Sequence, residues 1–166
     1  MQEWSDFYVA LGGAAAALTG LLFIAVSLRP REIRTTPLMV GRARSAFYAF
    51  ATITFVALLA LSGTGSRWVG LAQAGVALGM LGASMPFTVA AHRSGVLNYR
   101  RALPYHAGLL IVTIGGLMRA GGANWRDYSA VVAAGTLVLL AIALSNSWAL
   151  VISHQHDDPV LGDDSP

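Results

Sequence analysis

The chain has 166 residues and a formal net charge of +3, and 55% of its residues are hydrophobic while only 11% are charged. A soluble domain carries about a quarter charged residues, so this composition excludes the ordinary soluble class. The absence of cysteine excludes disulfides, thiol catalysis and thiolate metal sites. No alternating strand pattern recurs, so the apolar runs predict an all-α integral membrane helical bundle.

Five apolar stretches are candidates for helices that cross a hydrocarbon core of about 30 Å. The first is uncharged from Tyr8 to Leu28, whereas the apolar run of the fourth extends only from Ala107 to Met118. That fourth stretch therefore has an alternative, a re-entrant or interfacial segment, which would leave four spans. The five predicted spans are 8–28, 45–63, 68–90, 105–121 and 128–152.

The predicted domain organisation is one bundle, residues 1–153, followed by a polar tail, residues 154–166. The tail contains four aspartates and two prolines, and its composition predicts disorder. The N-terminus lacks the basic region of a cleaved signal peptide, so we expect the first span to remain in the mature protein.

Arginines gather in two of the segments between spans, residues 29–44 and 91–104. The positive-inside rule therefore predicts a multi-pass protein of the bacterial plasma membrane with both segments in the cytoplasm and the N-terminus outside. With five spans, the C-terminus is cytoplasmic. We expect the first segment to contact anionic lipids, and we expect no nucleic-acid binding because the arginines lie between apolar spans. The predicted lipid contacts are Arg29, Arg31, Arg34, Arg42 and Arg44.

Two predicted spans carry small residues at four-residue spacing, a pattern that lets helices approach closely. The members of these stripes are Gly12, Ala16 and Gly20 in the first span and Gly75, Gly79 and Ala83 in the third. We expect the two stripes to pack against each other.

Polar residues and one proline interrupt the third and fifth spans. Pro86 cannot donate a backbone hydrogen bond and is expected to bend its helix, while Ser84 and Thr88 beside it can bond to freed backbone groups. Gln73 and Asn146 are amides that need partners in lipid. Two interpretations stay open: a kinked, polar substrate lining, or separate hydrogen bonds between helices.

Residues for catalysis are scarce. No acidic residue occurs between Glu32 and Asp127, which argues against a proton relay or a carboxylate pair within the membrane. His154 and His156 could bind a metal together with the aspartates that follow them, although short histidine tracts are also common in polar tails. We therefore expect no enzymatic activity and no cofactor.

The N-terminal residues Trp4–Val9 (WSDFYV), Gly12 and Ala14–Leu28 (AAAALTGLLFIAVSL) resemble the opening of an uncharacterised family of small multi-span bacterial membrane proteins, frequent in actinobacteria. The resemblance is limited to the first span. It implies a small multi-span bacterial membrane protein and carries no chemistry over to this chain.

Two functions are favoured by these patterns, and an enzyme or cofactor role that uses the inner-face histidines is a distant third; these histidines are His92, His106, His154 and His156. The first is a structural or interaction role, in which the bundle self-associates as a homo-oligomer or serves as an accessory subunit of a membrane assembly. The alternative is a small channel or transporter for an ion or a small neutral solute. One continuous polar cavity lined by Thr52, Thr88, Thr113 and Asn146 would favour transport, whereas scattered pairing of these side chains between helices would favour the first role.

Overall fold

The computed structural model describes residues 2–28, 36–62, 67–93, 95 and 99–152. Within these ranges the chain forms long helices and no strand, so the all-α prediction is confirmed. The helices are α1 (Gln2–Leu28), α3 (Pro37–Leu61), α4 (Arg67–Arg93), α5 (Tyr99–Ala120) and α6 (Trp125–Ile152). The tail and the arginines at positions 29, 31 and 34 lie outside the described residues.

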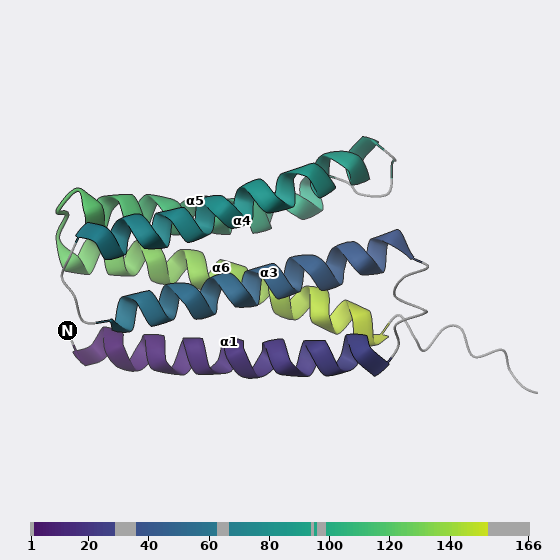
Figure 1. The fold of residues 1–166 in the computed structure, drawn as a ribbon, viewed down its shortest axis with the longest axis horizontal. Helices are drawn as coiled ribbons and strands as arrows, with labels where there is room; N and C mark the ends of the chain where they lie inside the picture. Colours follow the sequence, from purple (N-terminus) through teal and green to yellow (C-terminus); the bar gives the residue numbers. More distant parts are fainter. Residues whose placement is uncertain (1, 29–35, 63–66, 94, 96–98, 153–166) are drawn as a thin grey trace, which may run out of the picture.

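Successive helices run in opposite directions along one bundle (Figure 1). α1 packs mainly against α3, α3 also contacts α4 and α6, and α5 packs along both α4 and α6. The starts of α3 and α5 therefore meet the ends of α4 and α6 at the end of the bundle away from the N-terminus, which we call the distal end.

Local sequence explains where two of the helices stop or start. Pro37 occupies the first position of α3, where its missing N–H costs nothing, and Thr36 before it is extended. α5 ends in a Schellman turn: Gly122 adopts a positive φ of 82°, and the N–H of Ala123 donates to the carbonyl of Met118 at 3.0 Å. This turn sends the chain directly into α6.

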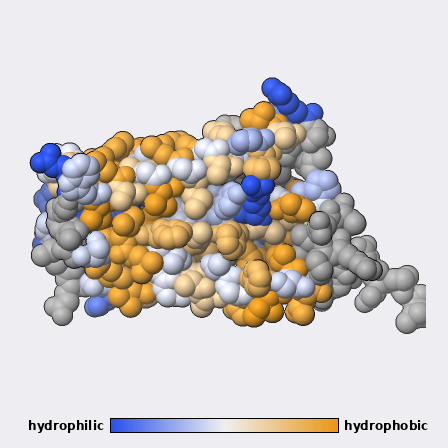
Figure 2. All heavy atoms as spheres, in the orientation of Figure 1, coloured by the Kyte–Doolittle hydropathy of each residue, from blue (hydrophilic) through white to orange (hydrophobic). Residues whose placement is uncertain are grey.

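Four helices, α1, α3, α4 and α6, contain stretches that are long and apolar enough to cross a membrane. α5 does not reach that apolar content, so composition does not confirm the predicted fourth span, 105–121. Large apolar side chains nevertheless point outward from every helix, and apolar residues cover much of the face drawn in Figure 2. A surface of this kind suits lipid rather than water, which supports a membrane protein.

Glycines set the spacing at two helix contacts. A Cβ added to Gly70 of α4 would lie 2.5 Å from the Gly116 carbonyl oxygen, and a Cβ added to Gly116 would lie 2.7 Å from the Gly70 oxygen. In α5 and α6, Cβ atoms at Gly115 and Gly135 would lie 2.5 Å and 2.8 Å from valine side chains of the facing helix. The α4–α5 and α5–α6 backbones approach this closely because these positions have no side chain.

The predicted pairing of the two small-residue stripes is wrong. Gly12 is in close contact, but with Ala57 of α3, whose Cβ lies 2.9 Å from the Cβ that Gly12 lacks. No atom lies within 4 Å of a Cβ built at Gly75 or Gly79, and Ala83 is exposed. The physical reason is that α3 lies between α1 and α4 in the bundle (Figure 1).

The rest of the first stripe also faces away from the protein. Ala16 and Gly20 are exposed, and no atom lies within 4 Å of a Cβ built at Gly20. α1 instead buries Leu11, Ala15 and Leu22, which lie on the neighbouring side of the same helix. The four-residue spacing therefore identified faces on which small residues gather but not which face turns inward.

Candidate functional site

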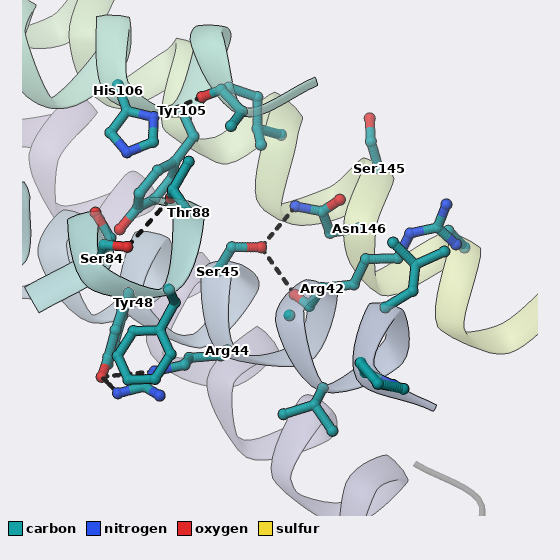
Figure 3. Close-up of a pocket in the computed structure, with 18 of the residues that line it drawn as sticks. Arg42, Arg44, Ser45, Tyr48, Ser84, Thr88, Tyr105, His106, Ser145 and Asn146 are labelled. Carbon is teal, nitrogen blue, oxygen red and sulfur yellow. Dashed lines mark hydrogen bonds between the residues drawn. The ribbon is translucent and has the colours of Figure 1, made fainter. Parts of the chain in front are cut away.

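A pocket of about 880 Å³ opens at the distal end of the bundle, and we call it the distal pocket. Its walls come from the first turns of α3, the last turns of α4, the start of α5 and the last third of α6 (Figure 3). The volume lies within the roughly 300–1,000 Å³ of small-molecule sites, and apolar atoms form most of the lining surface. The polar lining residues are Arg42, Arg44, Ser45, Tyr48, Ser84, Thr88, Tyr105, His106, Ser145 and Asn146.

Arg44 is the cationic group that the structure orients most firmly. Its Nε and Nη2 donate to the Tyr48 hydroxyl at 3.0 and 2.7 Å, one helical turn further along α3. Its Cζ lies 3.3 Å from the centroid of the Phe87 ring of α4. This stacking on an aromatic face and the double hydrogen bond hold the guanidinium at the pocket wall (Figure 3).

Asn146 joins α6 to α3 across the pocket. Its Nδ2 donates to the Ser45 hydroxyl at 3.0 Å, and that hydroxyl donates to the Arg42 carbonyl at 3.0 Å. The need of this amide for a partner in an adjacent helix was predicted from the sequence, and the contact confirms it.

The α5 wall carries two side chains that are almost fully buried. His106 is 6% exposed, and its Nδ1 lies 2.8 Å from the Ala102 carbonyl oxygen. A carbonyl only accepts, so Nδ1 carries the proton of this bond. Nε2 then faces away from the α5 backbone, and no described residue provides a hydrogen-bond partner for it.

Tyr105, 4% exposed, packs its ring against the His106 ring edge to face, with centroids 5.4 Å apart. Its hydroxyl lies near that of Ser84, yet the pair lacks hydrogen-bond geometry, and no other described atom satisfies the phenol. Two buried polar groups of α5 therefore lack partners at the pocket wall. Such groups are uncommon in folded proteins and are typical of sites that receive a ligand or water.

Pro86 lies inside α4, which continues through it to Arg93. The hydroxyl of Ser84 donates to the Leu81 carbonyl at 2.9 Å, and that of Thr88 donates to the Ser84 carbonyl at 3.1 Å. Neither bonds to Gly82, the carbonyl that Pro86 leaves free. Ser84 and Thr88 line the pocket as predicted, but their protons are used within α4.

Other predicted polar residues lie away from the pocket. Gln73 is buried between α4 and α3, where its Nε2 donates to the Val56 carbonyl at 3.3 Å. Thr52 and Thr113 bond to carbonyls of their own helices. Thr52 and Thr113 do not line the pocket with Thr88 and Asn146, and of these four residues only Asn146 bonds to another helix.

Several predicted site residues are not described. The arginines Arg29, Arg31 and Arg34 and the metal candidates His154 and His156 lie outside the described ranges. Within the described part of the chain, no group of three potential histidine, aspartate or glutamate ligands comes together. Of the predicted lipid-contacting arginines, Arg42 and Arg44 line the pocket.

Sequence reasoning missed the aromatic residues of the site, Tyr48, Phe87 and Tyr105. The four-residue spacing of Arg44 and Tyr48 was a readable signal, because such pairs meet on a helix. Contacts between helices, such as that of Phe87 with Arg44, could not be predicted from the residues next to them in the sequence. Comparisons with protein-family models, curated proteins and solved structures find no match to this chain.

Proposed function

We propose that this chain is a non-enzymatic membrane protein that binds a small amphipathic molecule in the distal pocket. The observation that carries this proposal is the pocket itself, a space of about 880 Å³ with mainly apolar walls and several oriented polar groups. This combination suits a ligand with an apolar body and a polar end. This role differs from the self-association or accessory role expected from the sequence, and it requires no cofactor.

We further propose that all five helices cross the bacterial plasma membrane, with the distal end in the cytoplasm. The 22 residues of α5 extend about 33 Å at about 1.5 Å per residue, enough for a hydrocarbon core of about 30 Å. Leu110, Ile114 and Leu117 form an outward apolar face on α5, each about half exposed. An interfacial segment would not need such a face along a helix packed lengthwise between α4 and α6.

Filling the distal pocket with a large side chain tests whether it binds a small molecule. Ala149 lines the pocket on α6, whereas Ala141, two turns earlier, is exposed and does not line it. We expect Ala149→Trp to reduce the amount of lipid or other small molecule that co-purifies with the chain by about tenfold, as native mass spectrometry measures it. Ala141→Trp should leave that amount unchanged. Equal ligand occupancy in both variants would refute the pocket as the binding site.

Self-association is a second candidate, favoured by the open glycine face of α4. Gly75 and Gly79 have no neighbour from another helix, although glycines elsewhere in α4 and α5 are used for close packing. Because the chain lacks cysteine, Gly79→Cys introduces a single thiol on this face. We expect oxidation in native membranes to produce a disulfide-linked dimer, whereas Ala77→Cys, which is buried, should stay monomeric. A monomeric Gly79→Cys variant would exclude this contact.

A channel or transporter remains the alternative predicted from the sequence. The hydroxyls of Thr52, Thr113 and Thr136 bond to their own helix carbonyls, so the bundle interior offers few free polar groups to a moving solute. Measurement of flux across vesicles containing the purified chain, with a panel of ions and neutral solutes, tests this alternative. We expect no flux above that of protein-free vesicles.

A further inference from the structure

We infer that the distal pocket selects an anionic amphiphile, an acyl chain with a carboxylate or phosphate head, whose head is bound at Arg44. This inference rests on the proposed ligand-binding function and adds the charge of the ligand. Three features of the pocket carry it: a cation without a carboxylate partner among the described residues, buried polar atoms that no described residue satisfies, and apolar walls.

The first feature is the charge. Arg42 and Arg44 both line the pocket. The acidic side chains that the structure describes, Asp6 and Asp127, lie in the first turns of α1 and α6, at the opposite end of the bundle. Arg44 therefore has aromatic and hydroxyl partners but no described counter-ion. A guanidinium held at an apolar wall without an anion favours an anionic ligand, which it can bind through its remaining N–H groups.

The second feature is the α5 wall. His106 is buried and lines the pocket, and its Nε2 has no partner among the described residues. The phenol of Tyr105 beside it is also unsatisfied. A phenol donates to a carboxylate or phosphate oxygen, and Nε2, as an acceptor, can receive the proton of a water or of a hydroxyl on a phosphate head. Both atoms are buried beneath the pocket surface, so a head group or a water reaches them only where neighbouring side chains shift.

The third feature is the apolar lining, which a bare anion would leave empty. Leu38 and Val40 of α3, Ala90 of α4, and Ile142 and Ala149 of α6 all face the pocket. Polar atoms contribute only a minor part of the surface of the pocket. An inorganic anion would satisfy Arg44 but would gain nothing from these walls, whereas an acyl chain buries its methylenes against them.

The experiment compares four probes on the purified full chain in a neutral detergent, with dissociation constants from native mass spectrometry. Oleate and lysophosphatidate carry an anionic head, monoolein carries a neutral head on the same chain, and inorganic phosphate has no chain. We expect at least one anionic amphiphile to bind at least about tenfold more tightly than monoolein, and phosphate to bind undetectably. The comparison of oleate with lysophosphatidate identifies a carboxylate or a phosphate head.

Variants of Arg44 test where the head group of the ligand binds. Arg44→Gln should reduce the preference for the anionic probe over monoolein to near unity, and Arg44→Met should do the same while keeping an apolar stem on Phe87. Arg93→Gln, which removes an exposed arginine from the same end of the bundle but outside the pocket, should preserve the preference.

Each of the remaining outcomes contradicts one part of the inference or the proposed function. Equal binding of oleate, lysophosphatidate and monoolein by the wild-type chain would overturn the charge inference and leave the proposed function intact. If phosphate bound as tightly as lysophosphatidate, the inference that the ligand is an amphiphile would be overturned. An anionic preference that survives in both Arg44 variants would overturn the placement of the head. No binding by any of the three amphiphiles would contradict the proposed function itself.

Discussion

Arg44 and Phe87 face each other across the boundary between α3 and α4, with the Arg44 Cζ 3.3 Å from the centroid of the Phe87 ring. Arg44 lies two turns into α3, and Phe87 lies directly after the proline of α4. The contact joins two helix ends that meet at the distal end of the bundle, and it holds the guanidinium beside the pocket.

The first prediction concerns the strength of this contact. In a double-mutant cycle of Arg44→Gln and Phe87→Leu, we expect a coupling free energy of about 0.5–2 kcal/mol in favour of the wild-type pair, because a desolvated guanidinium is attracted to the ring face. Unfolding of the purified protein in detergent measures it. The same cycle with Phe55, which is exposed on α3 away from the pocket, should give a coupling near zero. Equal coupling in the two cycles would contradict the interaction.

The second prediction separates the two kinds of glycine. A Cβ at Gly116 would lie 2.7 Å from the Gly70 oxygen and 2.8 Å from the Ala74 nitrogen, both backbone atoms that cannot move aside. We expect Gly116→Ala to lower the free energy of unfolding by about 1–3 kcal/mol, as overpacking does. Gly79→Ala, on the open face of α4, should be neutral or raise stability by up to about 1 kcal/mol. Unfolding curves of both variants in one detergent test this, and equal effects would refute the close α4–α5 contact.

The third prediction tests the crossing of α5. In the cysteine-free chain, Arg93→Cys introduces a thiol before α5, and Ala123→Cys introduces one after it. We expect a membrane-impermeant maleimide to label Ala123→Cys in intact cells and to label Arg93→Cys only after lysis, because α5 carries the chain across the membrane. Labelling of both variants under the same conditions would instead favour four spans.

The fourth prediction concerns Gln73, an amide in the apolar core. Its bond to the Val56 carbonyl is long at 3.3 Å, and its Oε1 is buried with no partner among the described residues. We expect Gln73→Met to leave the free energy of unfolding unchanged or to raise it by about 1 kcal/mol, because it removes an unsatisfied acceptor. Gln73→Glu, which adds a buried charge at the same site, should be strongly destabilising. A large loss of stability in Gln73→Met would show that the amide has a role that these contacts do not explain.

Much of the secondary structure was readable from local sequence. The apolar runs located all five helices, and Pro37 marks the first residue of α3. The helices extend beyond the predicted spans: α3 begins at Pro37, ahead of the span predicted from residue 45, and therefore includes Arg42 and Arg44. The short apolar run of α5 left open, from the sequence, whether this segment crosses the membrane. In the structure α5 is a continuous helix, but it lacks the apolar content of the other four helices.

The site was only partly predictable. Ser84, Thr88 and Asn146 were identified as polar residues in apolar helices, and the structure brings all three to the pocket. Gln73 had the same signal but lies elsewhere, because an amide in an apolar run shows only that it needs a partner. Tyr105 and Phe87 gave no signal, since an aromatic residue near a helix end is equally suited to lipid, to the core or to a pocket.

The sequence by itself determined that this chain forms long apolar helices and that its arginines concentrate in two of the segments between the apolar runs. These properties follow from residues close together in the chain, where hydropathy and proline act locally. Only the tertiary structure decided which glycine faces turn inward and that Ser45 and Asn146, 101 residues apart, meet across one pocket. The physical reason is that lipid is as apolar as a leucine face, so hydropathy cannot select the partner of a helix. Close backbone approach, such as that of Gly70 to Gly116, and hydrogen bonds between helices make that selection.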